Sequence, residues 1–160
     1  MDGVGDPPKK LRALPATKGR DGDLIDIQLL TCQAVTSYPW TDGEPEIAET
    51  ISVQRYLVTV ADKVVTHAVR YGGVSMQPTI LNGSLVGIDL DNRHIVDSAM
   101  FAVQFSEGGY PVVRRLKPKV GGCLFAADNP ATEDQLIARE QMESGEIRIL
   151  GRVRWILNKF

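Results

Sequence analysis

Hydrophobic and polar residues alternate along much of the chain after residue 23. Between Leu24 and Leu29, isoleucine and leucine side chains alternate with Asp26 and Gln28, which is the period of a half-buried strand. Residues 147–157 show the same alternation, with apolar side chains on one face and arginines on the other. Further strands are predicted over residues 51–59, 64–71, 85–89, 101–105, 110–116 and 123–127.

Glycine and proline mark the places where these strands end. Gly108-Gly109 lies between two predicted strands and is typical of a hairpin turn. Pro39, Gly43 and Pro45 indicate that residues 31–50 are irregular. Short helical turns are predicted over residues 75–81, over 133–143 and, as an alternative to a strand, over 53–57.

Many short strands separated by turn residues, with no internal repeat, predict a mostly β fold with one or two short helical turns. A chain of 160 residues is long enough for a core, and one folded domain is expected over residues 24–160. Residues 1–23 are rich in glycine, proline and charged residues and show no periodicity, so we expect a flexible linker or tail there.

Composition and charge exclude several classes of function. Hydrophobic residues make up 43% and charged residues 24%, which are ordinary globular values. A net charge of −2 gives no basic footprint for nucleic acid, so contact with DNA is expected only through another part of the protein. The sequence contains no apolar stretch of about 20 residues and no signal-peptide pattern. No membrane contact and a cytoplasmic location are therefore expected.

The cysteine and histidine residues do not indicate a metal site. Cys32 and Cys123 are expected to be reduced core residues, as in a cytosolic protein. His67 and His94 are isolated from each other and from the cysteines. We therefore expect no metal ion and no cofactor.

One segment carries residues that suit catalysis. It reads Gly73-Val74-Ser75-Met76-Gln77-Pro78-Thr79-Ile80 and continues Asn82-Gly83-Ser84-Leu85-Val86. Gly73 permits a tight turn, and a serine at the start of a helical turn has backbone N–H groups nearby that can form an oxyanion hole. Met76 can fill an apolar gap beneath the site, and Pro78 suits the first turn of a helix. The pattern therefore suits a nucleophile at Ser75.

This segment resembles the signature GDSM-x-PT-(I/L)-x-x-GD-x-V of LexA, UmuD, lambda-type phage repressors and bacterial signal peptidases. Signal peptidases also carry a membrane anchor, which this sequence does not contain, so the phage-repressor branch fits better. The resemblance spans about residues 24–160 and implies a compact LexA-like C-terminal domain of short, strongly twisted strands. Other parts of the chain resemble the family in the same order, namely Val86–Asp89, Phe101–Val103, Val113–Leu116, Ala127–Pro130 and Ile149–Trp155.

The residue that resembles the family's catalytic lysine is an arginine in this chain. In that family a lysine acts as general base for the serine, and Arg114 stands at the matching position, 39 residues after Ser75. A guanidinium has a pKa above about 12 and cannot serve as a neutral base. Because side chains alternate along a strand, Lys117 and Lys119 are expected to point away from Ser75. The resemblance thus implies a degenerate serine peptidase, with an inactive Arg114 beside Ser75.

The self-cleavage site of the family is also altered. Relatives of this type cut themselves at an Ala-Gly or Cys-Gly bond, and neither dipeptide occurs in this chain. The corresponding stretch contains Ala34 and Val35, and a β-branched Val35 suits a tight cleavage loop poorly. Val74 and Ser84 replace aspartates of the family signature. We therefore regard Ala34 and Val35 as a vestigial cleavage site.

The resemblance implies a C-terminal oligomerisation and regulatory domain of a phage-type transcriptional repressor that does not cleave itself. Expected partners are a second copy, or a higher homo-oligomer, and an inducer protein of an SOS-type response. DNA contact is expected only through an N-terminal helix-turn-helix, which this sequence does not contain. Two alternatives are an active Ser–Lys autopeptidase that inactivates the repressor on induction, and a peptide-binding module whose cleft holds a segment as an added strand.

Overall fold

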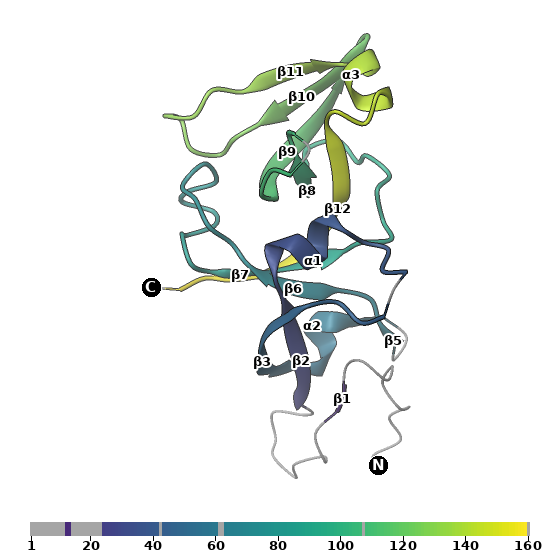
Figure 1. The fold of residues 1–160 in the computed structure, drawn as a ribbon. Coiled ribbons are helices and arrows are strands. Elements are labelled where there is room, and N and C mark those ends of the chain that lie inside the picture. The colour runs from purple at the N-terminus through teal and green to yellow at the C-terminus, as the bar shows by residue number, and fades with distance from the viewer. Residues whose placement is uncertain (1–11, 14–23, 42, 61–62, 107, 160) are drawn as a thin grey trace.

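Strands dominate the fold, and this confirms the predicted mostly β class (Figure 1). The computed structural model describes residues 12–13, 24–41, 43–60, 63–106 and 108–159. The three helices in these residues are short: α1 (Cys32–Thr36), α2 (Arg55–Val58) and α3 (Arg139–Glu143). The strands are β1 (Arg12–Ala13), β2 (Leu24–Leu30), β3 (Ile47–Gln54), β4 (Thr59–Val60), β5 (Lys63–Val64), β6 (His67–Arg70), β7 (Leu85–Asp89), β8 (Ala99–Gln104), β9 (Val112–Lys119), β10 (Gly122–Ala126), β11 (Gln135–Ala138) and β12 (Arg148–Leu157).

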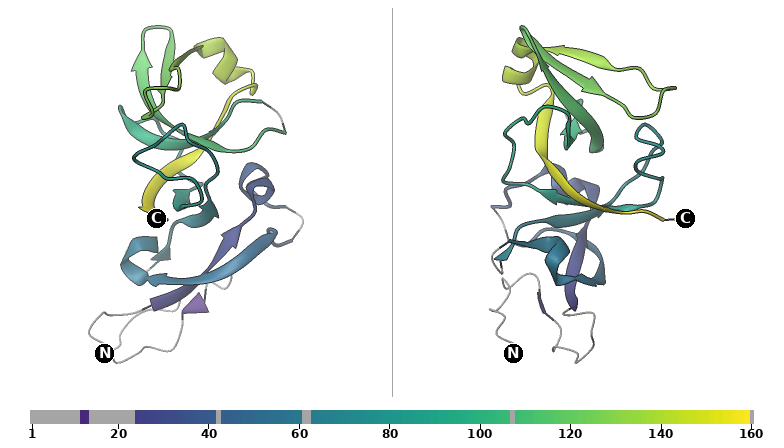
Figure 2. Two further views of the ribbon diagram at one scale, coloured as in Figure 1. Left: turned by 90° about the vertical axis from the view of Figure 1, so that its left-hand side faces the viewer. Right: turned by 180° about the vertical axis from the view of Figure 1, so that it is seen from behind.

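A ten-stranded sheet connects the two ends of the molecule. Its order is β1-β2-β6-β7-β12-β8-β9-β10-β11, with β3 also paired to β2, while β4 and β5 form a separate two-stranded sheet. Strand β12 lies between β7 and β8 and pairs antiparallel with both. Figure 2 shows β8–β11 with α3 at one end and β2, β3 and α2 at the other, with β12 joining the two ends.

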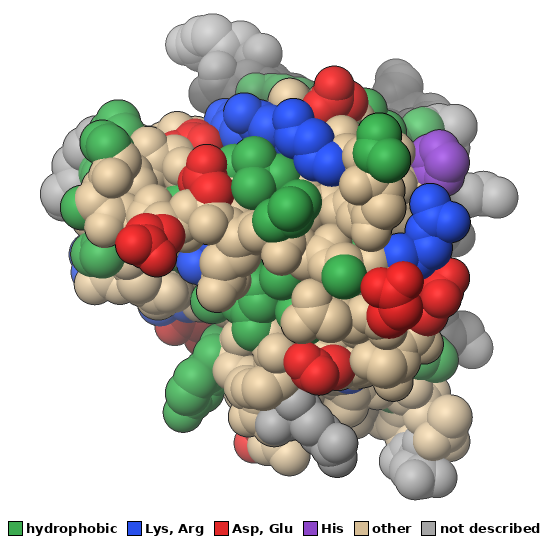
Figure 3. All heavy atoms as spheres, turned by 90° about the horizontal axis from the view of Figure 1, so that it is seen from above, with side chains coloured by type: hydrophobic (Ala, Val, Ile, Leu, Met, Phe, Trp, Pro, Cys, Tyr) green, Lys and Arg blue, Asp and Glu red, His purple; other side chains and the backbone are tan. Residues whose placement is uncertain are grey.

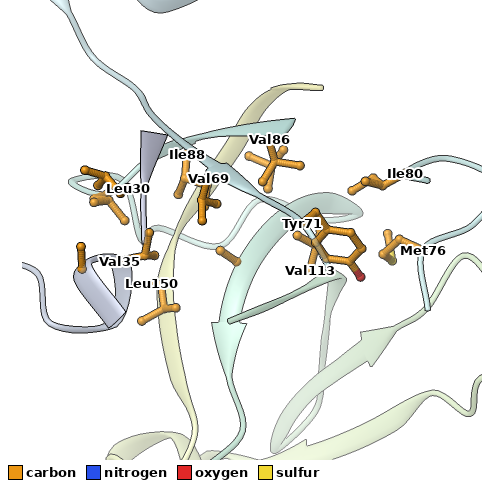
Figure 4. Packing of buried hydrophobic residues seen from close by; sticks show 14 residues of the cluster. Leu30, Val35, Val69, Tyr71, Met76, Ile80, Val86, Ile88, Val113 and Leu150 are labelled. Carbon is orange, nitrogen blue, oxygen red and sulfur yellow. The ribbon is translucent and has the colours of Figure 1, made fainter. Parts of the chain in front are cut away.

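Three clusters of buried side chains form the core. The central cluster includes Val35, Met76, Ile80 and Leu150, and Figure 4 shows it from close by. A second cluster is centred on β2 and includes Trp155. A third cluster lies among β8, β9 and β10 and includes Phe101 and Phe125, which are fully buried. The serine segment therefore packs through Met76 and Ile80 onto the cluster in the middle of the molecule.

Two predicted elements were wrong. Residues 31–50 are not irregular throughout, because they contain helix α1 and the start of β3. Residues 133–143 do not form one helix, since Gln135–Ala138 is strand β11 and only Arg139–Glu143 is helical. In both places a strand pairs antiparallel with the strand that precedes it in the sequence: β3 with β2, and β11 with β10.

Other predicted boundaries needed smaller corrections. The ambiguous residues 51–59 are divided, because β3 ends at Gln54 and α2 begins at Arg55. The single strand expected over 64–71 is interrupted, since β5 ends at Val64 and β6 begins at His67. The hairpin predicted around Gly108-Gly109 is confirmed by the antiparallel pairing of β8 with β9.

The apolar face of β12 is not the single parity that the sequence suggested. Register shifts occur between Ile149 and Gly151 and between Val153 and Trp155. As a result Leu150 is 2% exposed, while Leu157 is 38% exposed. A Cβ at Gly151 would lie 2.4 Å from the carbonyl oxygen of Asp89, so the backbones approach too closely there for a side chain.

The predicted tail, residues 1–23, lies mostly outside the described residues. Within it β1 pairs with β2 through Arg12 and Ala13. In the part of the chain that the structure describes, no helix is long and apolar enough to cross a membrane. Within the same residues no group of three or more potential ligands could hold a metal ion. Cys32 and Cys123 are free thiols, and burial raises the pKa of both, so neither is an activated nucleophile.

Candidate functional site

The serine segment forms the loop between β6 and β7. Hydrogen bonds close its two ends: Tyr71 N–H donates to Ser84 O at 2.7 Å, and Gly83 N–H donates to Tyr71 O at 2.8 Å. Gly73 has a φ of +127°, a conformation that favours glycine, and its N–H donates to Asn82 Oδ1 at 2.8 Å. The sequence prediction that Gly73 supports a tight turn is consistent with this geometry.

Within the loop the chain makes consecutive turns, and no helix begins at Ser75. Gln77 N–H donates to Val74 O at 3.1 Å, and Ile80 N–H donates to Met76 O at 2.9 Å. The N–H of Gln77 is therefore already used and is not free to form an oxyanion hole. Met76 is fully buried, as its predicted role as an apolar filler requires, whereas Pro78 is exposed.

The Ser75 hydroxyl lies between an arginine and a tyrosine. Arg114 Nη1 donates to Ser75 Oγ at 2.8 Å, and Tyr71 Oη lies 3.0 Å from the same oxygen. The structure thus brings together Ser75 and Arg114, which the sequence analysis had singled out. Tyr71 was not predicted from the sequence, because its contact with the Ser75 hydroxyl depends on the path of the folded loop.

Arg114 is held in place from several sides. Its Nη1 also donates to the carbonyl oxygen of Val113 at 2.8 Å, and its Cζ lies 5.4 Å from the centroid of the Phe105 ring. Its Nε is buried and has no hydrogen-bond partner among the described residues. Burial lowers the pKa of Arg114, while the nearby Tyr71 and Asp134 oppose this effect. A guanidinium remains a donor at neutral pH, so it cannot accept the proton of Ser75.

The opposite face of β9 carries a separate charged group. Arg115 Nε donates to Asp128 Oδ1 at 2.8 Å, and Thr79 Oγ1 donates to Asp128 Oδ2. Burial opposes ionisation of Asp128, but these hydrogen bonds outweigh it and the pKa of Asp128 lies below its ordinary value. Lys117 also interacts electrostatically with Asp128, so it belongs to this group.

Comparison with known proteins supports the family suggested by the serine loop. The sequence profile described as "Peptidase S24-like" matches residues 34–154, which is more than half of the chain. The chain belongs to the Peptidase S24-like family. It is also 29% identical, over 84 residues, to "Repressor protein CI" of Enterobacteria phage phi80. That match covers 52% of this chain and 33% of the phage protein, so the chain spans about a third of its relative.

The backbone of this S24-like serine loop is fixed by the turn after β10. Asn129 N–H donates to Ser75 O at 2.9 Å, and Asn129 Nδ2 donates to Val74 O at 2.9 Å. The N–H of Asp128 points to Met76 Sδ at 3.4 Å. The turn that resembles the family's "SDNP" motif therefore holds the residues on both sides of Ser75.

The segment after β12 holds the other end of the loop. Asn158 Oδ1 accepts a hydrogen bond from Leu81 N–H at 3.0 Å, and Asn158 Nδ2 donates to Thr79 O at 3.1 Å. Lys159 N–H donates to Ser84 Oγ at 2.8 Å, and Ser84 is fully buried. Ser84 thus has a structural contact at the position where the family signature has aspartate.

Ala34 and Val35 lie in helix α1 and are buried. Thr31 caps the helix by accepting the N–H of Ala34 at 3.1 Å, and Trp40 Nε1 donates to Ala34 O at 2.8 Å. Figure 4 shows Val35 beside Leu150 at one end of the central cluster, with Met76 at the other end. The structure does not bring the Ala34–Val35 bond to Ser75.

An open groove with a volume of about 610 Å³ has Arg114 among its lining residues. It lies at the end of the molecule that Figure 3 shows from above, where hydrophobic side chains lie among charges of both signs. The residues that line it come from β9, β11, α3 and neighbouring loops, and they are Phe105, Arg114, Thr132, Glu133, Gln135, Ile137, Gln141 and Ile147.

Proposed function

We propose that this chain is the C-terminal regulatory and self-associating domain of a phage-type transcriptional repressor, and that it does not cleave itself. The observation that carries the second part is the hydrogen bond of 2.8 Å from Arg114 Nη1 to Ser75 Oγ. A serine nucleophile needs a neighbouring base, and the group beside Ser75 is a permanent proton donor.

The position of the vestigial cleavage site supports the same proposal. Self-cleavage requires the Ser75 hydroxyl to reach the carbonyl carbon of the bond that is cut. Ala34 is 3% exposed and Val35 is 1% exposed, and both are held in a capped helix. Cleavage between them would require α1 to unfold as well as a base for Ser75.

The regulatory role is supported by the similarity to a phage repressor over 52% of this chain. The net charge of −2 makes this domain a poor DNA-binding surface by itself. We infer that a helix-turn-helix elsewhere in the full protein binds DNA, and that residues 24–160 associate with a second copy. Joining two DNA-binding heads raises affinity for a site with two halves, because the second contact becomes intramolecular. An inducer protein would then act on this domain without relying on self-cleavage.

The absence of self-cleavage can be tested by mass spectrometry. The purified chain is incubated at alkaline pH, where a lysine base would be most active, alongside Ser75→Ala as the matched control. We expect both proteins to keep their intact mass. A fragment cut near Ala34 that forms only when Ser75 is present would identify an active autopeptidase.

Self-association is tested separately by sedimentation equilibrium over a range of protein concentrations. We expect a dimer or a higher oligomer in reversible equilibrium with the monomer. A chain that stays monomeric at every concentration would rule out the assembly role while leaving the result on cleavage intact.

A further inference from the structure

We propose that Arg114 and the groove beside it bind an extended segment of a partner protein, with a carboxylate side chain of that segment paired to the Arg114 guanidinium. This inference goes beyond the repressor role and does not depend on it. It uses the side chain that removes the catalytic base as a recognition group.

Arg114 has hydrogen-bond donors that its contacts with Ser75 and Val113 do not use. Its hydrogen bonds to Ser75 Oγ and to Val113 O both use Nη1, and Tyr71 also interacts with the guanidinium. Nε is buried without a partner among the described residues, and Nη2 takes part in neither hydrogen bond. Nε and Nη2 form one edge of the planar guanidinium, and this edge matches the two oxygens of a carboxylate. A buried donor without an acceptor destabilises the folded chain. A ligand that supplies an acceptor removes this penalty and therefore binds more tightly.

The guanidinium of Arg114 is held in position by its neighbours. Phe105 lies against it, with Cζ of Arg114 5.4 Å from the ring centroid, and Ser75 Oγ accepts a hydrogen bond from Nη1. A guanidinium held in this way loses less side-chain entropy when it binds a carboxylate. We infer that a carboxylate in the groove pairs with Nη2 and, because Nε is buried, reaches Nε only after the guanidinium rotates.

The walls of the groove carry both apolar and polar side chains. Ile137 and Ile147 provide apolar surface, and Gln135 and Gln141 provide polar groups along the same groove. A volume of about 610 Å³ is enough for several side chains of a peptide. Strand β11, which carries Gln135 and Ile137, ends the strand order of the sheet, so among the described residues one of its edges has no strand partner. An exposed strand edge beside a groove favours an extended peptide as the occupant.

The charges in the groove specify where the carboxylate belongs. Glu133 lines the groove and is exposed, and Asp134 acts electrostatically on Arg114. A peptide carboxylate near Glu133 is repelled, whereas one next to Arg114 is attracted. Binding should therefore depend on the position of the acidic residue in the peptide and not on total negative charge.

The test uses a set of short blocked peptides of threonine and valine, with a single aspartate moved through every position. A matched set carries asparagine instead. Binding to the full chain is followed by NMR, through the Nε–Hε signal of Arg114 and the backbone signals of β11. We expect the best aspartate peptide to bind at least about tenfold more tightly than its asparagine counterpart, which is a difference typical of one charge-assisted hydrogen-bonded pair. We also expect this preference to disappear in Arg114→Gln.

Two variants keep the experiment decisive. Arg114→Lys retains the positive charge but loses the planar edge, and it should retain only part of the preference for aspartate. Arg154→Gln removes the same charge from an exposed position on β12 and should bind as the unchanged protein does. Equal affinity for aspartate and asparagine peptides would overturn the proposal. So would the absence of any binding at millimolar peptide, or an effect of Arg154→Gln equal to that of Arg114→Gln.

Discussion

The Ser75 hydroxyl accepts a hydrogen bond from Arg114, which is the reverse of the direction that a serine nucleophile needs towards its base. In a Ser–Lys peptidase the base must take the serine proton, so the serine acts as donor towards it. Here Arg114 donates to Ser75 Oγ, and Tyr71 Oη lies 3.0 Å from the same oxygen. The resemblance of the sequence to the family was enough to predict that residues 75 and 114 are neighbours. It could not predict Tyr71, because only the folded loop brings a residue four positions earlier onto the same hydroxyl.

Replacing Arg114 by lysine should give Ser75 a base. An amine can lose its proton, and the neutral fraction rises as the pH approaches the ordinary lysine pKa of about 10.4. We expect Arg114→Lys to react with a serine-directed fluorophosphonate, with a rate that increases from about pH 7 to about pH 10. Intact-mass measurement detects the adduct. The double variant Arg114→Lys with Ser75→Ala should stay unlabelled, and labelling of Arg114→Lys no faster than that of the original chain would contradict this account.

The same single variant should not restore self-cleavage. The Ala34–Val35 bond lies in the capped helix α1, and neither residue is accessible to Ser75 in the structure. The expected result after long incubation of Arg114→Lys at alkaline pH is an intact chain by mass spectrometry. A cut near Ala34 would mean that α1 unfolds readily and that the missing base alone prevents cleavage.

Asp128 should make stability depend on pH. Its pKa is lowered in the folded chain, so its ionised form contributes stability above the unfolded pKa of about 3.9. That contribution is lost as the pH falls through the lower folded pKa. We expect Asp128→Asn to lower the free energy of unfolding by about 1–3 kcal/mol at neutral pH, with the difference shrinking below about pH 4. Urea unfolding at both pH values measures this effect, and Glu143→Gln, at an exposed position, should change little at either. If the difference in the free energy of unfolding between the two proteins grew on acidification, the pKa of Asp128 would be raised in the folded chain and not lowered.

At the scale of elements, the alternation of apolar and polar residues predicted the regular strands well. It failed where pairing with another strand determines the secondary structure. Residues 24–29 have strong apolar alternation and the β8–β9 hairpin has a clear turn signal, and both fold as expected. Helix α1 has only five residues, which is too short for a helical period to show. Residues 135–138 favour helix by composition, yet they pair with β10, because tertiary contacts override weak intrinsic preference.

The serine loop is a second place where the local sequence pattern could not predict the backbone conformation. A helix would use the loop's backbone groups in internal hydrogen bonds. Instead Ser75 O accepts from Asn129, and Thr79 O and Leu81 N–H are taken by Asn158. Since these partners lie about 50 and 80 residues away in sequence, local patterns cannot reveal them.

The contact between β7 and β12 should be intolerant of added volume. A Cβ at Gly87 would lie 2.0 Å from Trp155 Cε2, and the Trp155 indole donates to Thr66 Oγ1 at 3.0 Å inside the core. We expect Gly87→Ala to lower the free energy of unfolding by about 1–3 kcal/mol, because Trp155 must move. Urea unfolding and the indole N–H signal in NMR check this. Gly72→Ala is the control, since its Cβ would meet nothing within 4 Å, and equal stability of the two variants would contradict the packing argument.

At the scale of the whole molecule, the sheet order places β12 between the two ends of the fold. Residues 24–160 carry all the described elements except β1, and we propose that they form one independently folding domain. The central cluster, which spans α1, the serine loop and β12, supports this proposal because it joins segments from the whole of that range.

Deleting residues 1–23 should therefore leave a folded domain. β1 contributes only the pairing of Arg12 and Ala13 with β2, so we expect a loss of no more than about 2 kcal/mol in the free energy of unfolding. Urea unfolding should give a cooperative transition with little change in its slope. Deletion of residues 1–11 alone retains β1 and is the control. A non-cooperative transition after the longer deletion would show that the domain begins earlier in the chain.

The place of β12 also has a consequence for synthesis on the ribosome. It is the last of the described strands to be made, yet β7 and β8 both need it as a neighbour. Until residues 148–159 have been translated, these two strands present unpaired edges, and the Thr79–Leu81 part of the serine loop lacks Asn158. The nascent domain must therefore remain incompletely folded until β12 has been made, and a ribosome stalled shortly before β12 would display a chain prone to aggregation.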